Sequence, residues 1–194
     1  MNSNDIMGWC NFFDLYQEAV DRTESGIFAE VGVFQGQSSV YLGQKIKESK
    51  KDIKLLSIDL FPTKDELIAH KDIGAGQSAE YQIIMDLPKS LLDTFVENTR
   101  NCNVSDVIVP IKSDSMKAAS IFPDNYLSMV FLDDCHFYDY VLQELEVWWP
   151  KVVSGGMYMG HDFYHGVERA VNEFFGKLGI SVQRRTDCWV VYKE

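Results

Sequence analysis

The sequence has few basic residues and no long apolar run. Its 194 residues include 18 lysine and arginine residues against 29 aspartate and glutamate residues, which gives a net charge of −11 at pH 7. A protein with this charge repels phosphate backbones and anionic lipid headgroups, so nucleic acids and membrane surfaces are poor candidate partners. No uninterrupted apolar run approaches the ~20 residues that a membrane-spanning helix needs.

Cysteines are also scarce. The four of them, Cys10, Cys102, Cys135 and Cys188, lie far apart and form no Cys-x-x-Cys pair. This pattern excludes a dense disulfide framework and the usual structural zinc motifs. The first residues, Met1–Asp5, lack the basic start and apolar stretch of a signal peptide. We therefore expect reduced thiols and a cytoplasmic location.

The remaining composition is typical of one well-packed domain. Apolar residues make up 46% of the chain and aromatic residues 13%, which is ample for a single core in a chain of this length. The sequence has no internal repeat and no low-complexity tract. We expect one domain over residues 1–194, with an amphipathic helix within residues 1–25 and an insertion or lid over the site at residues 60–105.

Alternating apolar and amphipathic stretches predict an α/β fold. Short apolar runs predict buried strands at 27–33, 53–58, 107–111, 126–132 and 155–162, and a closing hairpin from 180–182 and 189–192. Apolar residues at helical spacing predict helices at 12–21, 39–49, 137–148 and 167–175. Because Pro110 cannot donate to a strand ladder, the strand that contains it is expected at the edge of the sheet.

Polar side chains follow two of these strands at the point where each strand ends. In Val130–His136 an apolar run stops at two carboxylates and an imidazole, and the run after Gly155 ends in His161 and Asp162. Ligands of open α/β sheets collect outside the carboxyl ends of parallel strands. We therefore expect Asp133, His136, His161 and Asp162 to meet, where they could hold a substrate or a metal ion.

A glycine loop follows the first strand. Its glycines, Gly32 and Gly36, fit neither the three-glycine dinucleotide fingerprint nor the P-loop, which needs a lysine followed by serine or threonine. Glu30 lies two residues before the first glycine, where a carboxylate disfavours a pyrophosphate and favours a cation. S-adenosylmethionine carries a sulfonium and an ammonium and no phosphate, so the loop favours this cofactor.

Polar residues also follow the second and third strands. Asp59 lies where folds of this type bind ribose hydroxyls, because a carboxylate can accept two hydrogen bonds from a diol. NAD sites also bind the ribose diol with a carboxylate, so Asp59 alone does not distinguish the two cofactors. Asp114 and Ser115 are expected to line the adenine side, and the alternative for each is a helix cap or a solvated loop residue.

Several candidates have simpler explanations. His136 could face solvent in the first turn of a helix, and His161 could cap a strand end. Cys135 could be a nucleophile, but no partner residue supports that role. His70 and the loop Gly74–Ser78 could close over a substrate or form a plain surface loop.

Three motifs resemble a known family. Ala29–Ser38 resembles the first motif of class I S-adenosylmethionine-dependent methyltransferases. Phe131–Tyr138 and Met159–Asp162 resemble the small metal-dependent O-methyltransferases grouped with macrocin O-methyltransferase and cephalosporin hydroxylase-like proteins. The similarity covers roughly residues 27–192. It implies a Rossmann-like, seven-stranded, mostly parallel sheet with an antiparallel C-terminal hairpin, helices on both faces, and the third strand at one edge.

The resemblance also implies roles for single residues. In that family an Asp after the fourth strand binds a metal ion, a His three residues later acts as base, and an adjacent pair after the fifth strand completes the metal site. Carried over, this makes Asp133, His161 and Asp162 the ligands of a divalent metal, Mg²⁺ in the first instance, and His136 the catalytic base. The implied cofactor-binding residues are Glu30, Gly32, Gly36, Ser38, Asp59, Asp114, Ser115 and Asp133. The chain departs from the family at Asp134, where relatives commonly have glycine, and at His161, where some have a carboxylate.

Together these features predict an S-adenosylmethionine-dependent O-methyltransferase, assisted by a divalent metal, that acts on a hydroxyl of a small molecule such as a sugar, a natural product or a phenol. A bound cation stabilises an alkoxide or phenolate while His136 accepts its proton. Two alternatives stay open: a metal-independent methyltransferase, and a non-catalytic cofactor-binding scaffold or partner subunit. A homodimer, common in the resembled family, is one possible assembly.

Overall fold

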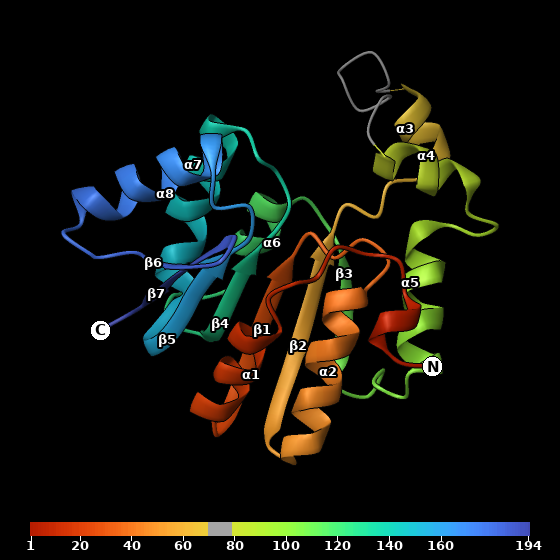
Figure 1. Ribbon diagram of the computed structural model, residues 1–194, viewed down its shortest axis with the longest axis horizontal. Coiled ribbons are helices and arrows are strands. Elements are labelled where there is room, and N and C mark those ends of the chain that lie inside the picture. The colour runs from red at the N-terminus through yellow and green to blue at the C-terminus, as the bar shows by residue number, and fades with distance from the viewer. Residues whose placement is uncertain (70–78) are drawn as a thin grey trace.

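The computed structural model describes residues 1–69 and 79–194. His70 and the loop at 74–78, considered above as a closing segment, lie outside the described residues. The described chain forms one seven-stranded sheet with the order β3-β2-β1-β4-β5-β7-β6 (Figure 1). Strands β1 to β5 pair in parallel, whereas β7 pairs antiparallel with both β5 and β6.

The strands are β1 (Ser25–Val31), β2 (Asp52–Asp59), β3 (Ile108–Lys112), β4 (Leu127–Leu132), β5 (Val152–Gly160), β6 (Gln183–Arg185) and β7 (Cys188–Tyr192). The α-helices are α1 (Phe13–Arg22), α2 (Gln37–Ser49), α3 (Lys64–Ala69), α4 (Ala79–Asp86), α5 (Leu91–Asn101), α6 (Ser115–Ser120), α7 (Tyr138–Trp148) and α8 (His165–Lys177). Two short 3₁₀ turns, η1 (Ser3–Asp5) and η4 (Trp149–Lys151), complete the described elements.

Alternate residues of the central strands face two separate hydrophobic layers. On β4, Phe131 packs into the layer covered by α1, α2 and α5, whereas Val130 packs into the layer covered by α6, α7 and α8. Both residues are fully buried. Strands that are buried on both faces read as continuous apolar runs, which is why the sequence signalled them clearly.

The predicted Rossmann-like fold is confirmed, including the edge position of the strand that contains Pro110. Two predicted boundaries were wrong. The outer arm of the hairpin is β6 rather than residues 180–182, because Ile180 instead closes the end of α8 by donating its N–H to the Phe175 carbonyl. Strand β5 begins at Val152, before the two glycines, since Gly155 and Gly156 continue the ladder by pairing with Lys193.

A close backbone contact joins the ends of β1 and β4. Gly32 has a φ of +81°, and a Cβ at this position would lie 2.2 Å from the carbonyl oxygen of Asp133. Gly32 donates its N–H to Ile58, and Asp133 donates its N–H to Val31. Only glycine fits this crossing, which brings three strand ends together.

The described part of the chain contains no helix that is both long enough and apolar enough to cross a bilayer. The four cysteines are all free.

Candidate active site

A cavity of about 600 Å³ lies where β1, β2, β4 and β5 end. Its walls come from the segment before α1, the loop after β1, helices α3 and α4, and the residues that follow β4 and β5. The predicted site residues that line it are Gly32, Ser38, Asp59, Asp133, His136, His161 and Asp162. Cavities of this size are typical of small-molecule and cofactor sites.

The segment before α1 forms a wall that the sequence did not reveal. The ring of Trp9 packs against Phe34, with 5.6 Å between the ring centroids. The Gln37 side chain anchors the segment to α2, because its Oε1 accepts from the Cys10 N–H at 2.9 Å and its Nε2 donates to the Ile6 carbonyl at 3.1 Å. The aromatic side chain of Trp9 was the one local signal of this role.

Asp59 braces the glycine loop. One of its oxygens accepts from the N–H groups of Val33 and Phe34, both at 2.9 Å, and the other accepts from the Phe61 N–H at 2.7 Å. Phe34 and Phe61 have φ values of +47° and +41°, in the left-handed region that costs non-glycine residues energy. Burial raises the pKa of Asp59, although the three hydrogen bonds act in the opposite direction. The carboxylate thus shapes the loop against which a cofactor would lie.

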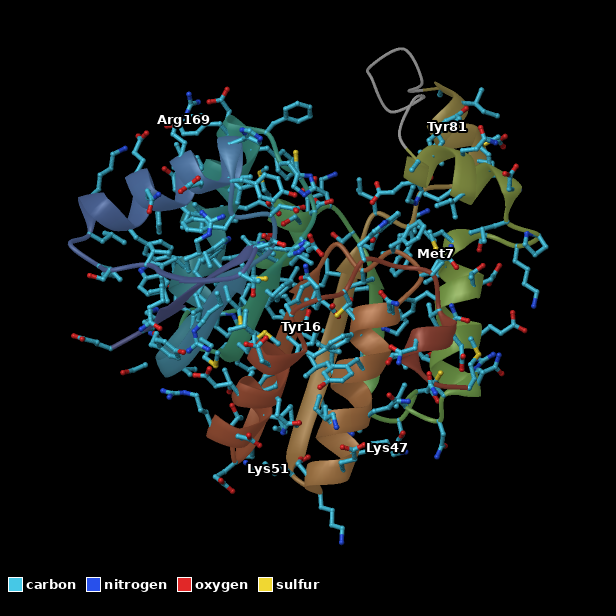
Figure 2. All side chains as sticks on the ribbon, in the orientation of Figure 1. Met7, Tyr16, Lys47, Lys51, Tyr81 and Arg169 are labelled. Carbon is cyan, nitrogen blue, oxygen red and sulfur yellow. The ribbon has the colours of Figure 1, made fainter. Side chains whose placement is uncertain are left out.

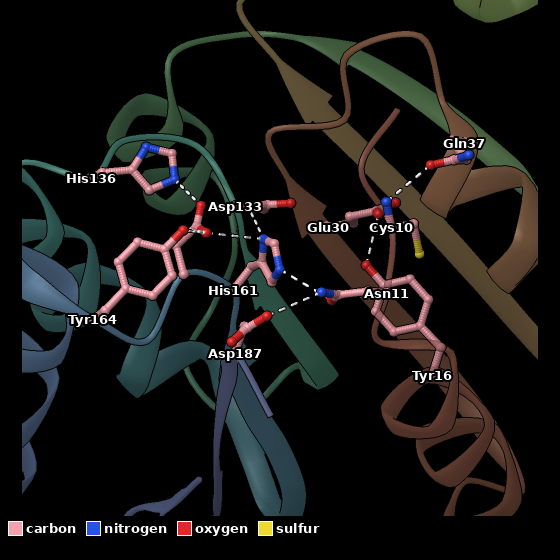
Figure 3. Close-up of polar contacts among 11 residues, drawn as sticks. Cys10, Asn11, Tyr16, Glu30, Gln37, Asp133, His136, His161, Tyr164 and Asp187 are labelled. Carbon is pink, nitrogen blue, oxygen red and sulfur yellow. Dashed lines mark hydrogen bonds and ion pairs between the residues drawn. The ribbon is translucent and has the colours of Figure 1, made fainter. Parts of the chain in front are cut away.

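Glu30 lies away from the cavity lining. It is 1% exposed, and it accepts hydrogen bonds from the Ser39 hydroxyl and from the Tyr16 hydroxyl at 2.7 Å. Figure 3 shows the contact with Tyr16. Burial raises its pKa, and hydrogen bonds with Ser38, Ser39 and Tyr16 offset part of the effect. Its contacts join α1, β1 and α2, so the structure gives Glu30 a place beneath the loop rather than at its surface.

Gly36 and Asp114 also lie outside the lining. Gly36, with a φ of +89°, is the N-cap of α2, and a Cβ there would lie 2.8 Å from the Phe95 ring. Asp114 is the N-cap of α6 and accepts from the Lys117 N–H at 3.1 Å. The contacts of Asp114 are those of the helix-cap alternative.

Ser115 is buried behind the strand ends. Its hydroxyl donates to Glu144 and accepts from Trp148 Nε1, the latter at 3.0 Å. Burial raises the pKa of Glu144 to about 8. No local pattern predicts this pair, because α6 and α7 meet only in the folded protein.

The four polar residues after β4 and β5 converge. Asp133, His136 and Asp162 each offer a ligand atom within 4.8 Å of the other two. His136 Nε2 pairs with an oxygen of Asp162, and His161 Nδ1 lies 3.4 Å from Asp133 Oδ1 and 3.6 Å from Asp162 Oδ1 (Figure 3). The predicted grouping therefore exists in space. The three residues whose ligand atoms meet include His136, which the resemblance made the base, rather than His161, which it made a metal ligand.

The carboxylates and histidines of this cluster shift one another's pKa values. Burial acts to raise the pKa of Asp162, but hydrogen bonds from His136 and Tyr164 and the charges of the two histidines outweigh it and lower the pKa to about 2. The hydrogen bond with Asp162 raises the pKa of His136, against the effect of burial. Burial dominates at Asp133 and raises its pKa. A buried carboxylate of this kind gains stability from a nearby cation.

The donor set fits a divalent metal ion. Carboxylate oxygens are the ligands that Mg²⁺ prefers, and imidazole nitrogens extend the range to Mn²⁺, Fe²⁺ and Zn²⁺. Asp133 and Asp162 offer the oxygens, and the two histidines the nitrogens. Tyr164, which donates to Asp162, and Asn11, whose Oδ1 lies 3.2 Å from His161 Nε2, are further members of the site. Asn11 had no local signal, since it lies 150 positions from His161.

Comparison with known proteins gives a consistent result. A family model described as a methyltransferase domain matches residues 29–163. The fold is similar to those of the O-methyltransferase NovP (TM-score 0.70, 17% identity, covering 93% of this chain and 78% of NovP) and the calicheamicin methyltransferase CalS11 (0.66, 14%, 93% and 76%). It is also similar to the precorrin 8w decarboxylase of Methanobacterium thermoautotrophicum (0.63, 12%, 100% and 96%). No curated protein sequence matches the chain.

At these identities the solved structures establish the fold, and the family model carries the assignment. It spans the glycine loop, Asp59 and the converging residues up to Asp162. The match covers well over half of the sequence, and the chain therefore belongs to the methyltransferase domain family.

Proposed function

We propose that this methyltransferase uses S-adenosylmethionine to methylate a hydroxyl of a small molecule, with the assistance of a divalent cation. The observation that carries the proposal is the convergence of Asp133 and Asp162 with the two histidines: His136 lies within 4.8 Å of both carboxylates and His161 Nδ1 lies 3.4 and 3.6 Å from them, in the cavity that also contains the glycine loop. Membership of the family supports methyl transfer, and the donor set supports a cation.

The transfer is an in-line displacement in which the acceptor oxygen bonds to the methyl carbon while the carbon–sulfur bond breaks. The enzyme must hold these atoms close together and exclude water. A cation held by Asp133, Asp162 and His161 would supply charge stabilisation to the acceptor oxygen. His136 suits the base, because its side chain is 56% exposed whereas that of His161 is 11% exposed. Asp162, paired with His136, stabilises the imidazolium that forms when the acceptor proton arrives.

The charge of the cavity favours a cationic cofactor. Five carboxylates line it: Asp59, Glu80, Asp133, Asp134 and Asp162. No described lysine or arginine is among the lining residues, and Lys71 is the one lysine or arginine outside the described ranges. A sulfonium is attracted by such a wall and a pyrophosphate is repelled, which supports S-adenosylmethionine over NAD.

The same lining favours an acceptor without phosphate groups. CalS11 is described as a TDP-rhamnose 3'-O-methyltransferase, so its acceptor carries a diphosphate. In the present chain Lys47 and Lys51 lie at the opposite end of the molecule from Met7 and Tyr81, which line the cavity (Figure 2). We therefore infer that the acceptor is a free sugar, a natural product or a phenol rather than a nucleotide-linked sugar.

Methyl transfer to a panel of phosphate-free sugars and phenols, followed by mass spectrometry, tests the function. We expect turnover that EDTA abolishes and Mg²⁺ restores. Removing ligand oxygens with Asp162→Ala should lower the rate by at least ~100-fold, whereas Asp52→Ala, an exposed position at the far end of β2, serves as the control. Turnover that EDTA leaves unchanged would favour the metal-independent alternative. Cofactor binding without turnover on any acceptor would favour the scaffold.

A further inference from the structure

His161 is held, on the side away from the carboxylates, by a residue from the other end of the chain. Asn11 Oδ1 lies 3.2 Å from His161 Nε2, and Asn11 Nδ2 donates to Asp187 Oδ2 at 3.3 Å. Asp187 lies in the turn between β6 and β7, where its carbonyl accepts from the Phe163 N–H at 2.7 Å. Figure 3 shows Asp187, Asn11, His161 and Asp133 in one continuous chain of contacts.

The chemistry of Asp187 determines how the Asn11 amide is turned. An ionised carboxylate only accepts hydrogen bonds, so it must face the NH₂ group of Asn11. The amide oxygen then faces His161. Because an amide oxygen also only accepts, the Nε2 atom of His161 must carry a proton in this arrangement.

The other ring nitrogen of His161 points at the carboxylates. Nδ1 lies 3.4 Å from Asp133 Oδ1 and 3.6 Å from Asp162 Oδ1, and ionised carboxylates only accept, so either a proton or a cation must lie between them and Nδ1. A neutral imidazole that is protonated on Nε2 presents a lone pair at Nδ1, which is the form that binds a metal ion. The ring is 5.1 Å from the Phe12 ring, and this packing limits its rotation.

We propose that Asn11, oriented by Asp187, is a positioning residue that keeps the proton of His161 on Nε2 and directs its Nδ1 lone pair toward Asp133 and Asp162. The inference rests on the proposed function, because the ligand that Nδ1 would bind is the divalent cation. It extends that function by making the segment before α1, and the hairpin turn after β6, part of the metal site. Hydrogen bonds to the second nitrogen of a metal-binding imidazole fix its orientation in this way in many metal sites.

Titration calorimetry with Mn²⁺ alone tests the effect on metal affinity. Asn11→Ala should weaken Mn²⁺ binding by ~10–100-fold, the usual effect of removing such a partner. The matched control is Gln17→Ala, which removes an amide side chain of α1 that donates to Asp21 and does not touch His161, and which should leave the affinity unchanged. The double variant Asn11→Asp with Asp187→Asn exchanges donor and acceptor but keeps an oxygen facing Nε2, so it should recover most of the affinity. Equal affinities in wild type and Asn11→Ala would overturn the proposal.

Nitrogen-15 NMR of the metal-free protein, at a pH where His161 is neutral, tests the position of the proton. We expect the proton to shift from Nε2 toward Nδ1 when Asn11 is replaced by alanine, because the acceptor at Nε2 is lost while Asp133 still accepts at Nδ1. A wild-type proton on Nδ1, or identical spectra for both proteins, would overturn the proposal even if Mn²⁺ binds. If the wild type binds no Mn²⁺, the metal part of the proposed function fails while this measurement still decides the role of Asn11. The wild-type spectrum also decides it should Asn11→Ala not fold.

Discussion

Glu144 is a carboxyl group inside the layer between the sheet and α7. It is 1% exposed, and its side chain accepts from the Ser115 hydroxyl while its carbonyl accepts from the Tyr158 hydroxyl at 3.2 Å. Burial raises its pKa to about 8, and the nearby charge of Asp134 adds to the effect. The folded protein therefore keeps a proton on Glu144 at a pH where the unfolded chain has lost it.

This difference makes the free energy of unfolding depend on pH. The unfolded chain loses the proton near 4.5 and the folded chain near 8, so the wild type should lose up to about 1.4 kcal/mol of stability per pH unit between these values. Glu144→Gln imitates the protonated side chain and should remove this slope, so its advantage over the wild type grows as the pH rises. Urea denaturation across the window measures it. Glu146→Gln, on the exposed face of the same helix, is the control, and an unchanged slope in Glu144→Gln would contradict the prediction.

At the level of elements, the crossing of β1 and β4 depends on Gly32. Gly155 has nearly the same backbone conformation, with a φ of +78° against +81° at Gly32. The two sites differ in space: a Cβ on Gly155 would have nothing within 4 Å, whereas a Cβ on Gly32 would meet the Asp133 carbonyl. Gly155→Ala should therefore cost only the left-handed backbone, about 1–2 kcal/mol. Gly32→Ala adds the clash and should cost roughly 2–5 kcal/mol. Chemical denaturation of both variants measures the difference, and equal losses would mean that the strand ends move apart easily.

The same elements show what the sequence could predict. Strands such as β4 were predictable because they are buried on both faces, and their polar ends revealed where Asp133 and Asp162 meet. The outer arm of the hairpin was not predictable, because Gln183–Arg185 owes its strand conformation to pairing with β7 rather than to its own residues. Glu30 accepts hydrogen bonds from Tyr16 and Ser39, which belong to other elements. No pattern in the residues around Glu30 predicts these two partners. Local patterns therefore located the site, while the contacts that orient its residues required the folded chain.

At the level of the whole molecule, the field of the protein acts on any charged ligand. The chain carries a net charge of −11, and the described lining of the cavity adds carboxylates without a lysine or arginine. Such a field concentrates cations at the opening and weakens as salt screens it. S-adenosylmethionine carries one positive charge more than its product, S-adenosylhomocysteine, because demethylation removes the sulfonium. The affinity of the protein for the cofactor should therefore depend more on ionic strength than its affinity for the product.

We expect the affinity for S-adenosylmethionine to fall several-fold between low and high salt, as calorimetry would measure it, and the affinity for S-adenosylhomocysteine to change much less. The two ligands share the adenosine and the amino acid moiety, so the comparison isolates the charge on sulfur. NAD, with its anionic pyrophosphate, should bind poorly at every salt concentration. An equal salt dependence for cofactor and product would mean that the lining carboxylates are neutralised before the cofactor arrives, whereas tight binding of NAD would contradict the proposed cofactor. A larger effect on the cofactor would also favour release of the product after each methyl transfer, because the attraction to the acidic wall disappears with the sulfonium.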